Sequence, residues 1–172
     1  AKYKPAQLII VERNESGLYE LKMELKRLNP GLEAVPALGT IQNHGTMERL
    51  FDMYQPQTVF HAAAYQHVPM MERHSWEAVF NNVLGSRVII HLCAVKGVER
   101  CVVVSTDKAV RPTNVMGATK RMVELITKCY AADSECRFMA VRFGNVLGSA
   151  GSVLPLFKAQ IEAGGPVTVT HP

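Results

Sequence analysis

The regular alternation of short apolar runs with amphipathic segments constrains the fold of this chain most. The expected strands are Gln7–Glu12, Val35–Leu38, Thr58–Ala62, Arg100–Ser105 and Arg137–Phe143. Between and after these strands, apolar residues recur at helical spacing. The expected helices are Gly17–Leu28, Thr46–Tyr54, Ser75–Lys96, Met116–Ala131 and Ser152–Ala163. Strands separated by helices join by right-handed crossovers into a parallel sheet with helices on both faces. We therefore predict an α/β fold of the Rossmann-like, doubly wound type.

Local signals predict where several of these helices begin and end. Ser75 is the expected N-cap of the long third helix, and Gly97 follows its end. Thr113 or Asn114 is the expected cap of the next helix. Pro30 and Pro56 follow the first two helices, where proline stops helical hydrogen bonding.

Composition is typical of one packed domain. The chain has 172 residues, of which 48% are hydrophobic and 20% charged, so disorder is not expected. The net charge of +4 comes from scattered Lys and Arg, which does not predict a nucleic-acid surface. The four cysteines form no CxxC pair and the six histidines lack metal-ligand spacing. We expect reduced, buried thiols, no metal site and no membrane-spanning run within these residues.

One feature of a dinucleotide-binding fold is missing from the sequence. Such folds normally begin with a strand and a GxGxxG loop, whose glycines let the backbone approach a pyrophosphate. No strand of this kind precedes Gln7, while Gly144, Gly148 and Gly151 come late and at other spacings. We therefore expect residues 1–172 to form a partial nucleotide-binding and catalytic domain that lacks the first strand and the glycine loop.

The carboxyl ends of the predicted strands are the expected ligand-binding positions. In open parallel sheets, ligands bind in the crevice outside these ends. The rule selects Glu12–Ser16, Ala62–Pro69, Ser105–Thr113 and Gly144–Ser152. Functional residues are therefore sought first in these four segments.

The segment Ser105-Thr106-Asp107-Lys108 carries the strongest chemical signal. A hydroxyl, a carboxylate and an amine stand together where a strand leaves the sheet. Such a cluster can hold a sugar hydroxyl and move protons at adjacent carbons. A solvated turn with an ordinary ion pair fits the residue types equally well.

Met116 and Lys120 have the spacing of a YxxxK pair, with methionine in place of tyrosine. Residues four apart share a helix face, where a lysine lowers the pKa of a tyrosine hydroxyl. Met116 cannot ionise, so spacing alone favours a packing role for it and a surface role for Lys120. Lys120 could alternatively bind ribose hydroxyls of a cofactor.

Several motifs resemble one enzyme family. They are VFHAAAYQHVP, NNVLGS, STDKAVRPTNVMGATKR, RFGNVLGSAGSV and GGPVTVTHP. The chain from about Gln7 to Pro172 resembles the bacterial polysaccharide-biosynthesis dehydratases, which are UDP-N-acetylglucosamine 4,6-dehydratases and relatives of the extended short-chain dehydrogenase/reductase type. It is most similar to their membrane-anchored branch, in which Met replaces the usual Tyr.

The resemblance implies a reaction and roles for four catalytic residues. NAD+ oxidises the C4 hydroxyl of a UDP-sugar, water leaves across C5 and C6, and the hydride returns to C6. Thr106 would hydrogen-bond the C4 oxygen, and Lys108 would take the C5 proton. Asp107 would protonate the departing C6 hydroxyl and, beside Met116, also accept the C4 proton. Lys120 would hold the nicotinamide ribose.

The resemblance also implies cofactor and substrate contacts. Ala62, Ala63 and Ala64 would line NAD, while Glu12 would bind the adenosine ribose diol and favour NAD over NADP, a preference that Arg13 softens. The expected substrate contacts are Asn145, Ser149, Ser152 and Val153. Gln66 and Thr40 replace the Lys and Asp that the family usually has, which removes one charged contact and changes the adenine contact.

Two other functions remain open from the sequence. A UDP-sugar epimerase uses the same sheet and cofactor, but normally needs the tyrosine that Met116 replaces. A non-catalytic nucleotide-binding relative is the alternative from another class. The resemblance further implies a homo-oligomer at the cytoplasmic face of the inner membrane, anchored through segments outside this chain, with a UDP-sugar partner.

Overall fold

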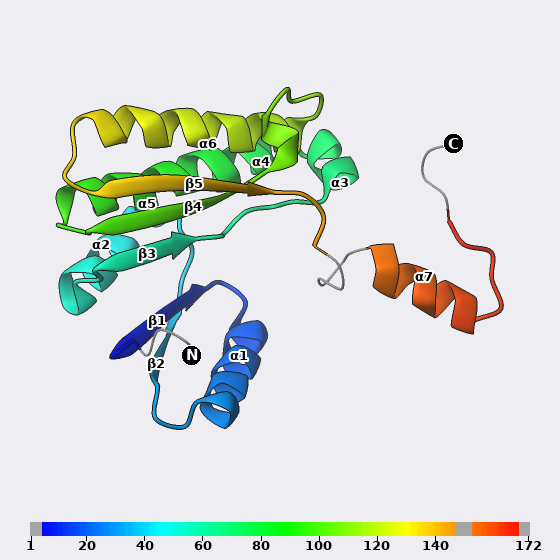
Figure 1. The fold of residues 1–172 in the computed structure, drawn as a ribbon, viewed down its shortest axis with the longest axis horizontal. Helices are drawn as coiled ribbons and strands as arrows, with labels where there is room; N and C mark the ends of the chain where they lie inside the picture. The colour runs from blue at the N-terminus through cyan, green and yellow to red at the C-terminus, as the bar shows by residue number, and fades with distance from the viewer. Residues whose placement is uncertain (1–4, 147–152, 169–172) are drawn as a thin grey trace.

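Residues 5–146 and 153–168 are described in the computed structural model, and their strands all run parallel. β1 (Gln7–Glu12) pairs with β2 (Glu33–Leu38) in one sheet. β3 (Thr58–His61), β4 (Arg100–Thr106) and β5 (Arg137–Phe143) form the other, in that order (Figure 1). The predicted parallel α/β fold is confirmed. The division into two sheets falls between β1 and β3, where a Rossmann-like order places its first strand.

Helices separate the strands as the sequence predicts, with some differences in detail. Their bounds are α1 (Glu15–Leu28), α2 (His44–Tyr54), α3 (Val68–Arg73), α4 (Ser75–Ala78), α5 (Gly85–Val95), α6 (Val115–Ala132) and α7 (Val153–Glu162). A π-helical segment, η1 (Val79–Leu84), joins α4 to α5, so the predicted long helix is interrupted. A 3-10 turn, η2 (Asp107–Ala109), follows β4, and α3 occupies a segment predicted to be a loop.

Asparagine side chains begin three of the helices. Asn14, Asn43 and Asn114 each accept a hydrogen bond from a backbone N–H in the first turn of α1, α2 or α6. The prediction of Ser75 as an N-cap was wrong, because Ser75 is the first residue of α4 and His74 precedes it without a side-chain cap. Gly97, at φ +73°, follows the end of α5 in the left-handed conformation that glycine tolerates, as predicted.

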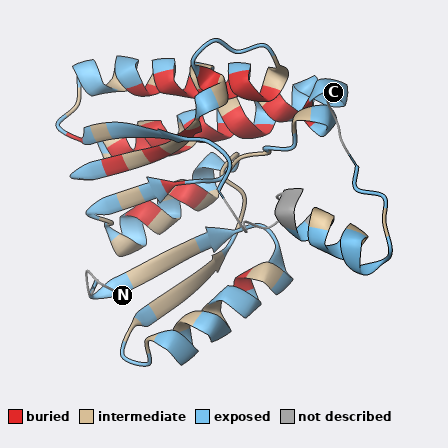
Figure 2. Cartoon of the chain, turned by 45° about the vertical axis from the view of Figure 1, so that its right-hand side comes forward, coloured by how far each residue is buried: buried red, intermediate tan, exposed pale blue. Residues whose placement is uncertain are grey.

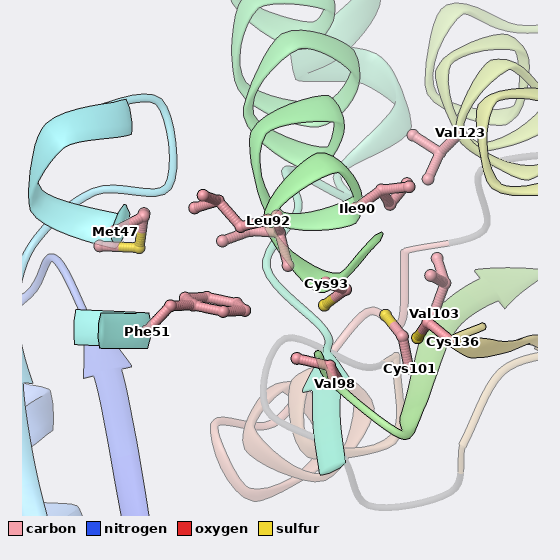
Figure 3. Packing of buried hydrophobic residues seen from close by; sticks show 11 residues of the cluster. Met47, Phe51, Ile90, Leu92, Cys93, Val98, Cys101, Val103, Val123 and Cys136 are labelled. Atoms are coloured by element: carbon pink, nitrogen blue, oxygen red, sulfur yellow. The ribbon is translucent and has the colours of Figure 1, made fainter. Parts of the chain in front are cut away.

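The main core lies between α5, α6 and one face of the β3–β4–β5 sheet. Met47 and Phe51 of α2 approach it from the side, next to Leu92 of α5 (Figure 3). The sequence prediction of buried cysteines is confirmed for three positions and wrong for Cys129, which is exposed. The buried members are Cys93, Cys101 and Cys136.

The opposite face of the same sheet is open among the described residues. Phe60 of β3 is 74% exposed, and its register neighbours along this face include Val102 of β4 and Met139 of β5. Almost all of β5, at the edge of this sheet, is exposed (Figure 2). Among the described residues, α5 and α6 therefore pack on one face of the β3–β4–β5 sheet, while α1 packs against the β1–β2 sheet.

The helical stretch Ser75–Val95 is long and apolar enough to cross a membrane by length and composition alone. Half of its most apolar window is buried inside the fold, as is usual for a core helix. The expectation that no such run exists was therefore wrong by that test, although Ile89, Ile90 and Leu92 of this stretch pack in the core.

Candidate functional site

The end of β4 brings together the hydroxyl, carboxylate and amine that the sequence singled out. The Thr106 hydroxyl donates a hydrogen bond to Asp107 Oδ1 at 2.8 Å, and Lys108 Nζ lies 3.1 Å from the same oxygen. Lys108 Nζ also lies 3.5 Å from Oδ1 of Asn145, which follows the neighbouring strand β5. Four predicted site residues therefore meet where two parallel strands end.

Charge at this cluster is set mainly by hydrogen bonding. The hydrogen bond from Thr106, followed by that from Lys108, lowers the pKa of Asp107 below its usual value. Asp107 is therefore ionised at neutral pH in the resting structure. In that state it accepts a proton, and it can donate one only after it has taken one up.

The N-terminal part of α6 lies directly against this cluster. A Cβ at Gly117 would clash with the backbone carbonyl oxygen of Lys108, so only glycine allows this close approach. A Cβ at Gly144 would lie 3.3 Å from Asp107 Oδ2. Glycines on two elements thus leave room around Asp107 and Lys108.

Met116 and Lys120 have different environments on α6. Met116 is buried against Met71 and Ala78, which agrees with the packing role that its residue type predicts. Lys120 is also buried, contrary to the surface reading, and its Nζ donates to the carbonyl of Val104 at 2.8 Å. Burial lowers the pKa of Lys120 to about 8.

A cavity of about 250 Å³ lies at the carboxyl ends of β1, β2 and β3. Its lining includes five of the six predicted cofactor residues, Glu12, Arg13, Ala62, Ala63 and Ala64, whereas Lys120 lies outside it. Ligand pockets commonly occupy roughly 300–1,000 Å³, so this cavity suits part of a dinucleotide. The three alanines present little bulk, as close approach of a planar ring requires.

Polar groups at the rim of this cavity are already engaged with the protein. Glu12 Oε1 accepts hydrogen bonds from the backbone N–H groups of Arg13 and Asn14, at 2.8 and 2.9 Å. The Arg13 guanidinium carbon lies 4.7 Å above the centre of the Tyr65 ring, in cation–π geometry. The cavity therefore offers a fixed carboxylate, a guanidinium and an aromatic ring next to the small alanines, and these residues fit the adenosine part of NAD.

Asn82 is a structural residue of the site that sequence reasoning missed. Its side chain accepts from the Tyr65 N–H at 2.8 Å and donates to the Tyr65 carbonyl at 3.0 Å. It also lies 3.0 Å from the hydroxyl of Thr119, the neighbour of Lys120. Asn82 thus connects α6 to the alanine loop, which is the segment of residues 62–65 after β3. Its position in the π-helical η1 lets it and Asn81 both point inward, and such segments frequently mark functional sites.

His61 is a buried side chain at the end of β3. Its Nε2 lies 2.7 Å from Ser86 Oγ. Burial, with a smaller contribution from the Lys120 ammonium, lowers the pKa of His61 to about 4. The ring is therefore neutral at physiological pH and connects α5 to the strand that leads into the alanine loop.

Three predicted substrate contacts receive no structural account. Ser149 and Ser152 lie outside the described residues, and Val153 begins α7 without a described side chain. Among the described residues no group of three or more His, Cys, Asp or Glu side chains could hold a metal ion.

Comparison with known proteins shows the family of the chain. It is 46% identical to the capsular polysaccharide biosynthesis protein CapD of Staphylococcus aureus over its whole length, and spans 29% of that protein. An uncharacterized membrane protein of Methanocaldococcus jannaschii is 42% identical, with 99% of this chain and 50% of that protein covered. Each of these relatives is thus much longer than this chain.

Two relatives have named activities that differ from each other. The inverting UDP-N-acetylglucosamine 4,6-dehydratase of Campylobacter jejuni is 34% identical over 98% of this chain and 51% of that protein. The UDP-glucose 4-epimerase of Rickettsia canadensis is 36% identical over 96% of this chain and 48% of that protein. Sequence similarity alone therefore does not separate dehydration from epimerisation.

Solved structures carry the same fold. Pen from Bacillus thuringiensis superposes with a TM-score of 0.84 at 33% identity, over 94% of this chain and 49% of Pen. The dTDP-glucose 4,6-dehydratase DesIV from Streptomyces venezuelae, solved with NAD bound, gives 0.77 at 20% identity, over 95% of this chain and 55% of that one. The model of the polysaccharide biosynthesis protein family matches residues 1–172, and the chain belongs to that family.

Proposed function

We propose that the full-length protein is an NAD-dependent nucleotide-sugar 4,6-dehydratase that acts on a UDP-N-acetylhexosamine, with UDP-N-acetylglucosamine as the first candidate. The observation that carries this proposal is the hydrogen-bonded Thr106–Asp107–Lys108 cluster at the end of β4. Elimination of water needs both a base at C5 and an acid at C6, and the cluster contains one group for each task. The Campylobacter relative supports the same choice.

NAD, when bound, supplies reversible hydride transfer from the sugar C4 to C6. Residues that would hold it are Glu12 and the alanines Ala62–Ala64 on one side and Lys120 on the other. The carboxylate of Glu12 suits a ribose diol and repels a 2′-phosphate, which favours NAD over NADP. Lys120 would exchange its hydrogen bond with Val104 for one to the nicotinamide ribose.

Thr106, Asp107 and Lys108 together would carry out all the proton transfers of the reaction. Thr106 would hold the C4 oxygen, and the ionised Asp107 would take the C4 hydroxyl proton as the C4–H bond loses its hydride. Lys108, after releasing a proton to solvent, would then take the C5 proton. Asp107 would pass its proton to the departing C6 hydroxyl, which leaves as water. Lys108 would finally return a proton to C5 as C6 accepts the hydride.

This assignment explains how the site can work without a tyrosine at position 116. Met116 is buried and cannot exchange protons, whereas Asp107 lies next to the Thr106 hydroxyl that would hold the substrate. Asn145 approaches Lys108 at 3.5 Å and would face the diphosphate side of the substrate. One carboxylate would thereby serve both oxidation and elimination.

The direct test is incubation of the purified full-length protein with UDP-N-acetylglucosamine, followed by mass spectrometry. The proposal predicts a product that has lost one water, and no such product from the Lys108→Ala variant. Unchanged substrate, or an isomer of the same mass, would contradict it.

Epimerisation is the second candidate, because the Rickettsia relative is named a UDP-glucose 4-epimerase. An epimerase moves hydride away from and back to C4, and it needs no acid–base pair for C5 and C6. The presence of both Asp107 and Lys108 at one strand end therefore favours dehydration.

We further propose that the full-length protein is a homo-oligomer held at the cytoplasmic face of a membrane. The name of the Methanocaldococcus relative, a membrane protein, supports the anchoring. Separation of membrane and soluble fractions of cells producing the full-length protein tests it, with recovery in the membrane fraction expected and a wholly soluble protein contradicting it.

A further inference from the structure

Glu124 is a buried carboxylate that the proposed chemistry does not use. It lies on α6 one turn after Lys120 and is 8% exposed. Its oxygens accept hydrogen bonds from Ser105 Oγ at 2.6 Å and from the Arg142 side chain at 2.8 and 2.7 Å. Arg121, which is 43% exposed at its side chain, adds a further contact at 3.0 Å.

The groups that Glu124 holds belong to two adjacent strands. Ser105 of β4 and Arg142 of β5 are register partners in the parallel sheet. One carboxylate on α6 therefore joins the second-last residues of both strands from the helix side. Since Lys120 also bonds to Val104, α6 holds two consecutive residues of β4.

Both strands lead directly from this contact into the candidate site. Thr106, Asp107 and Lys108 follow Ser105, and Asn145 lies three residues after Arg142. The two chain segments meet again where Lys108 Nζ approaches Asn145 Oδ1 at 3.5 Å. The contact at Glu124 and the contact at Lys108 thus lie at either end of the same short stretch of β4 and β5.

The charge and shape of this contact make it rigid. The two side-chain nitrogens of Arg142 meet the two oxygens of Glu124, which is the paired geometry that fixes direction as well as distance. Hydrogen bonding from Arg142, with smaller contributions from Ser105 and Arg121, lowers the pKa of Glu124 to about 2. The carboxylate therefore stays ionised throughout the pH range in which an enzyme of this kind works.

We propose that Glu124 is a positioning residue, which sets the separation of Lys108 and Asn145 through Ser105 and Arg142 without touching the sugar or NAD. The catalytic part of this inference rests on the proposed dehydratase function, whereas the positioning itself does not. Misplacement of a catalytic group by about 1 Å can reduce the rate about 100-fold, so a contact of this kind controls turnover from a distance.

The test compares Glu124→Gln with Arg121→Gln in the full-length protein. Glutamine keeps the shape but offers an NH2 group where Arg142 needs an acceptor. We expect kcat of Glu124→Gln to fall about 10- to 100-fold with KM nearly unchanged. Arg121→Gln removes only the exposed contact to the same carboxylate, and it should stay within about twofold of the wild type.

Hydrogen–deuterium exchange provides the readout that does not depend on activity. In Glu124→Gln, backbone amides of residues 104–108 and 142–145 should exchange faster than in the wild type, while Arg121→Gln should not differ. Arg142→Lys keeps the charge but loses the paired geometry, so it should reproduce both effects if Glu124→Gln does not fold.

The outcomes separate this inference from the proposed function. Wild-type kcat and wild-type exchange in Glu124→Gln, or in Arg142→Lys, would overturn it. A variant with a lower melting temperature but unchanged kcat would also overturn it, because that result describes a purely structural residue. If the wild type converts no UDP-sugar, the proposed function fails, while faster exchange at both strand ends in Glu124→Gln still supports the positioning role.

Discussion

At the residue scale, Lys108 is the group on which the proposed elimination depends most. It lies between Asp107 and Asn145, at 3.1 and 3.5 Å. Lys108→Ala in the full-length protein should reduce dehydration about 100- to 10,000-fold, the range typical of a lost general base. Lys158→Ala, which removes an exposed lysine of α7, is the matched control and should be neutral. Near-normal turnover of Lys108→Ala in a mass-spectrometric assay would exclude the lysine as the base.

The neighbouring carboxylate and the buried methionine should differ in their effects. Asp107→Asn removes the group that accepts the C4 proton, so its turnover should fall far more than that of Met116→Ala. Met116→Ala creates a cavity beside Met71 and should mainly cost stability, about 2–5 kcal/mol. Steady-state rates and thermal unfolding of both variants measure the contrast. Equal losses of turnover, or activity that requires Met116→Tyr, would contradict the assigned role of Asp107.

Glu124 should make the stability of the chain sensitive to acid. Its pKa is lowered from 4.5 to about 2 on folding, so the ionised group stabilises the folded state above pH 4.5. That contribution, on the order of 3 kcal/mol, is lost as pH falls toward 2. Urea unfolding from pH 5 to pH 2 should therefore show a steeper loss of stability in the wild type than in Glu124→Gln. Parallel curves would contradict the pKa shift.

Residue-level prediction from sequence succeeded where neighbouring residues carry the signal. Thr106, Asp107 and Lys108 are consecutive, and a strand end brings them together. Asn82 and Glu124 were missed because their partners lie 17 to 37 positions away along the chain. A polar residue inside an apolar helical pattern was the available signal for both.

At the scale of elements, the contact between α6 and η2 depends on one glycine. Gly117→Ala would drive a methyl group into the carbonyl oxygen of Lys108 and displace the turn that carries Asp107 and Lys108. We expect turnover to fall by at least about tenfold, because misplaced catalytic groups lose rate steeply. Gly31→Ala is the matched control, since no atom lies within 4 Å of its added Cβ. Equal kcat in the two variants would show that the close approach is unimportant.

The elements themselves followed the apolar pattern closely, and the exceptions have physical reasons. Ser75–Lys96 was expected as one helix, because its apolar spacing continues through the π-helical η1. Within η1, Asn82 is hydrogen-bonded to Tyr65, a partner 17 positions away that local spacing does not reveal. The segment that forms α3 was expected to be a loop, although Pro69 suits the first turn of a helix.

At the scale of the whole molecule, the described residues leave sheet edges and one sheet face open. Among the described residues β1 pairs only with β2 and β3 only with β4, and Phe60 is 74% exposed. Unpaired strand edges tend to pair with other chains. We therefore expect this chain alone to self-associate and to bind NAD weakly, since no glycine-rich phosphate loop lies among its residues. Light scattering and calorimetry test both, and a monomer with tight NAD binding would contradict the expectation.

The fold class was predictable at this scale because every strand carries its own apolar run and every connection its own helical pattern. The separation into two sheets agrees with the expected lack of a first strand, whereas the open face of β3–β4–β5 was not predicted, because it depends on which elements pack together. Register and burial are properties of the assembled sheet. Phe60 and Met139 are apolar and would be expected in the core, but no described residues cover them.

The central claim, that the full-length protein eliminates water from a UDP-sugar, is tested most directly by the reaction in D2O. Lys108 would remove the C5 proton and return one from solvent, so the product should have lost one water and gained one deuterium at C5. Mass spectrometry and proton NMR of the product report both changes. An epimerase would return its hydride to C4 and give an isomer of unchanged mass without deuterium at C5, and that result would contradict the proposal.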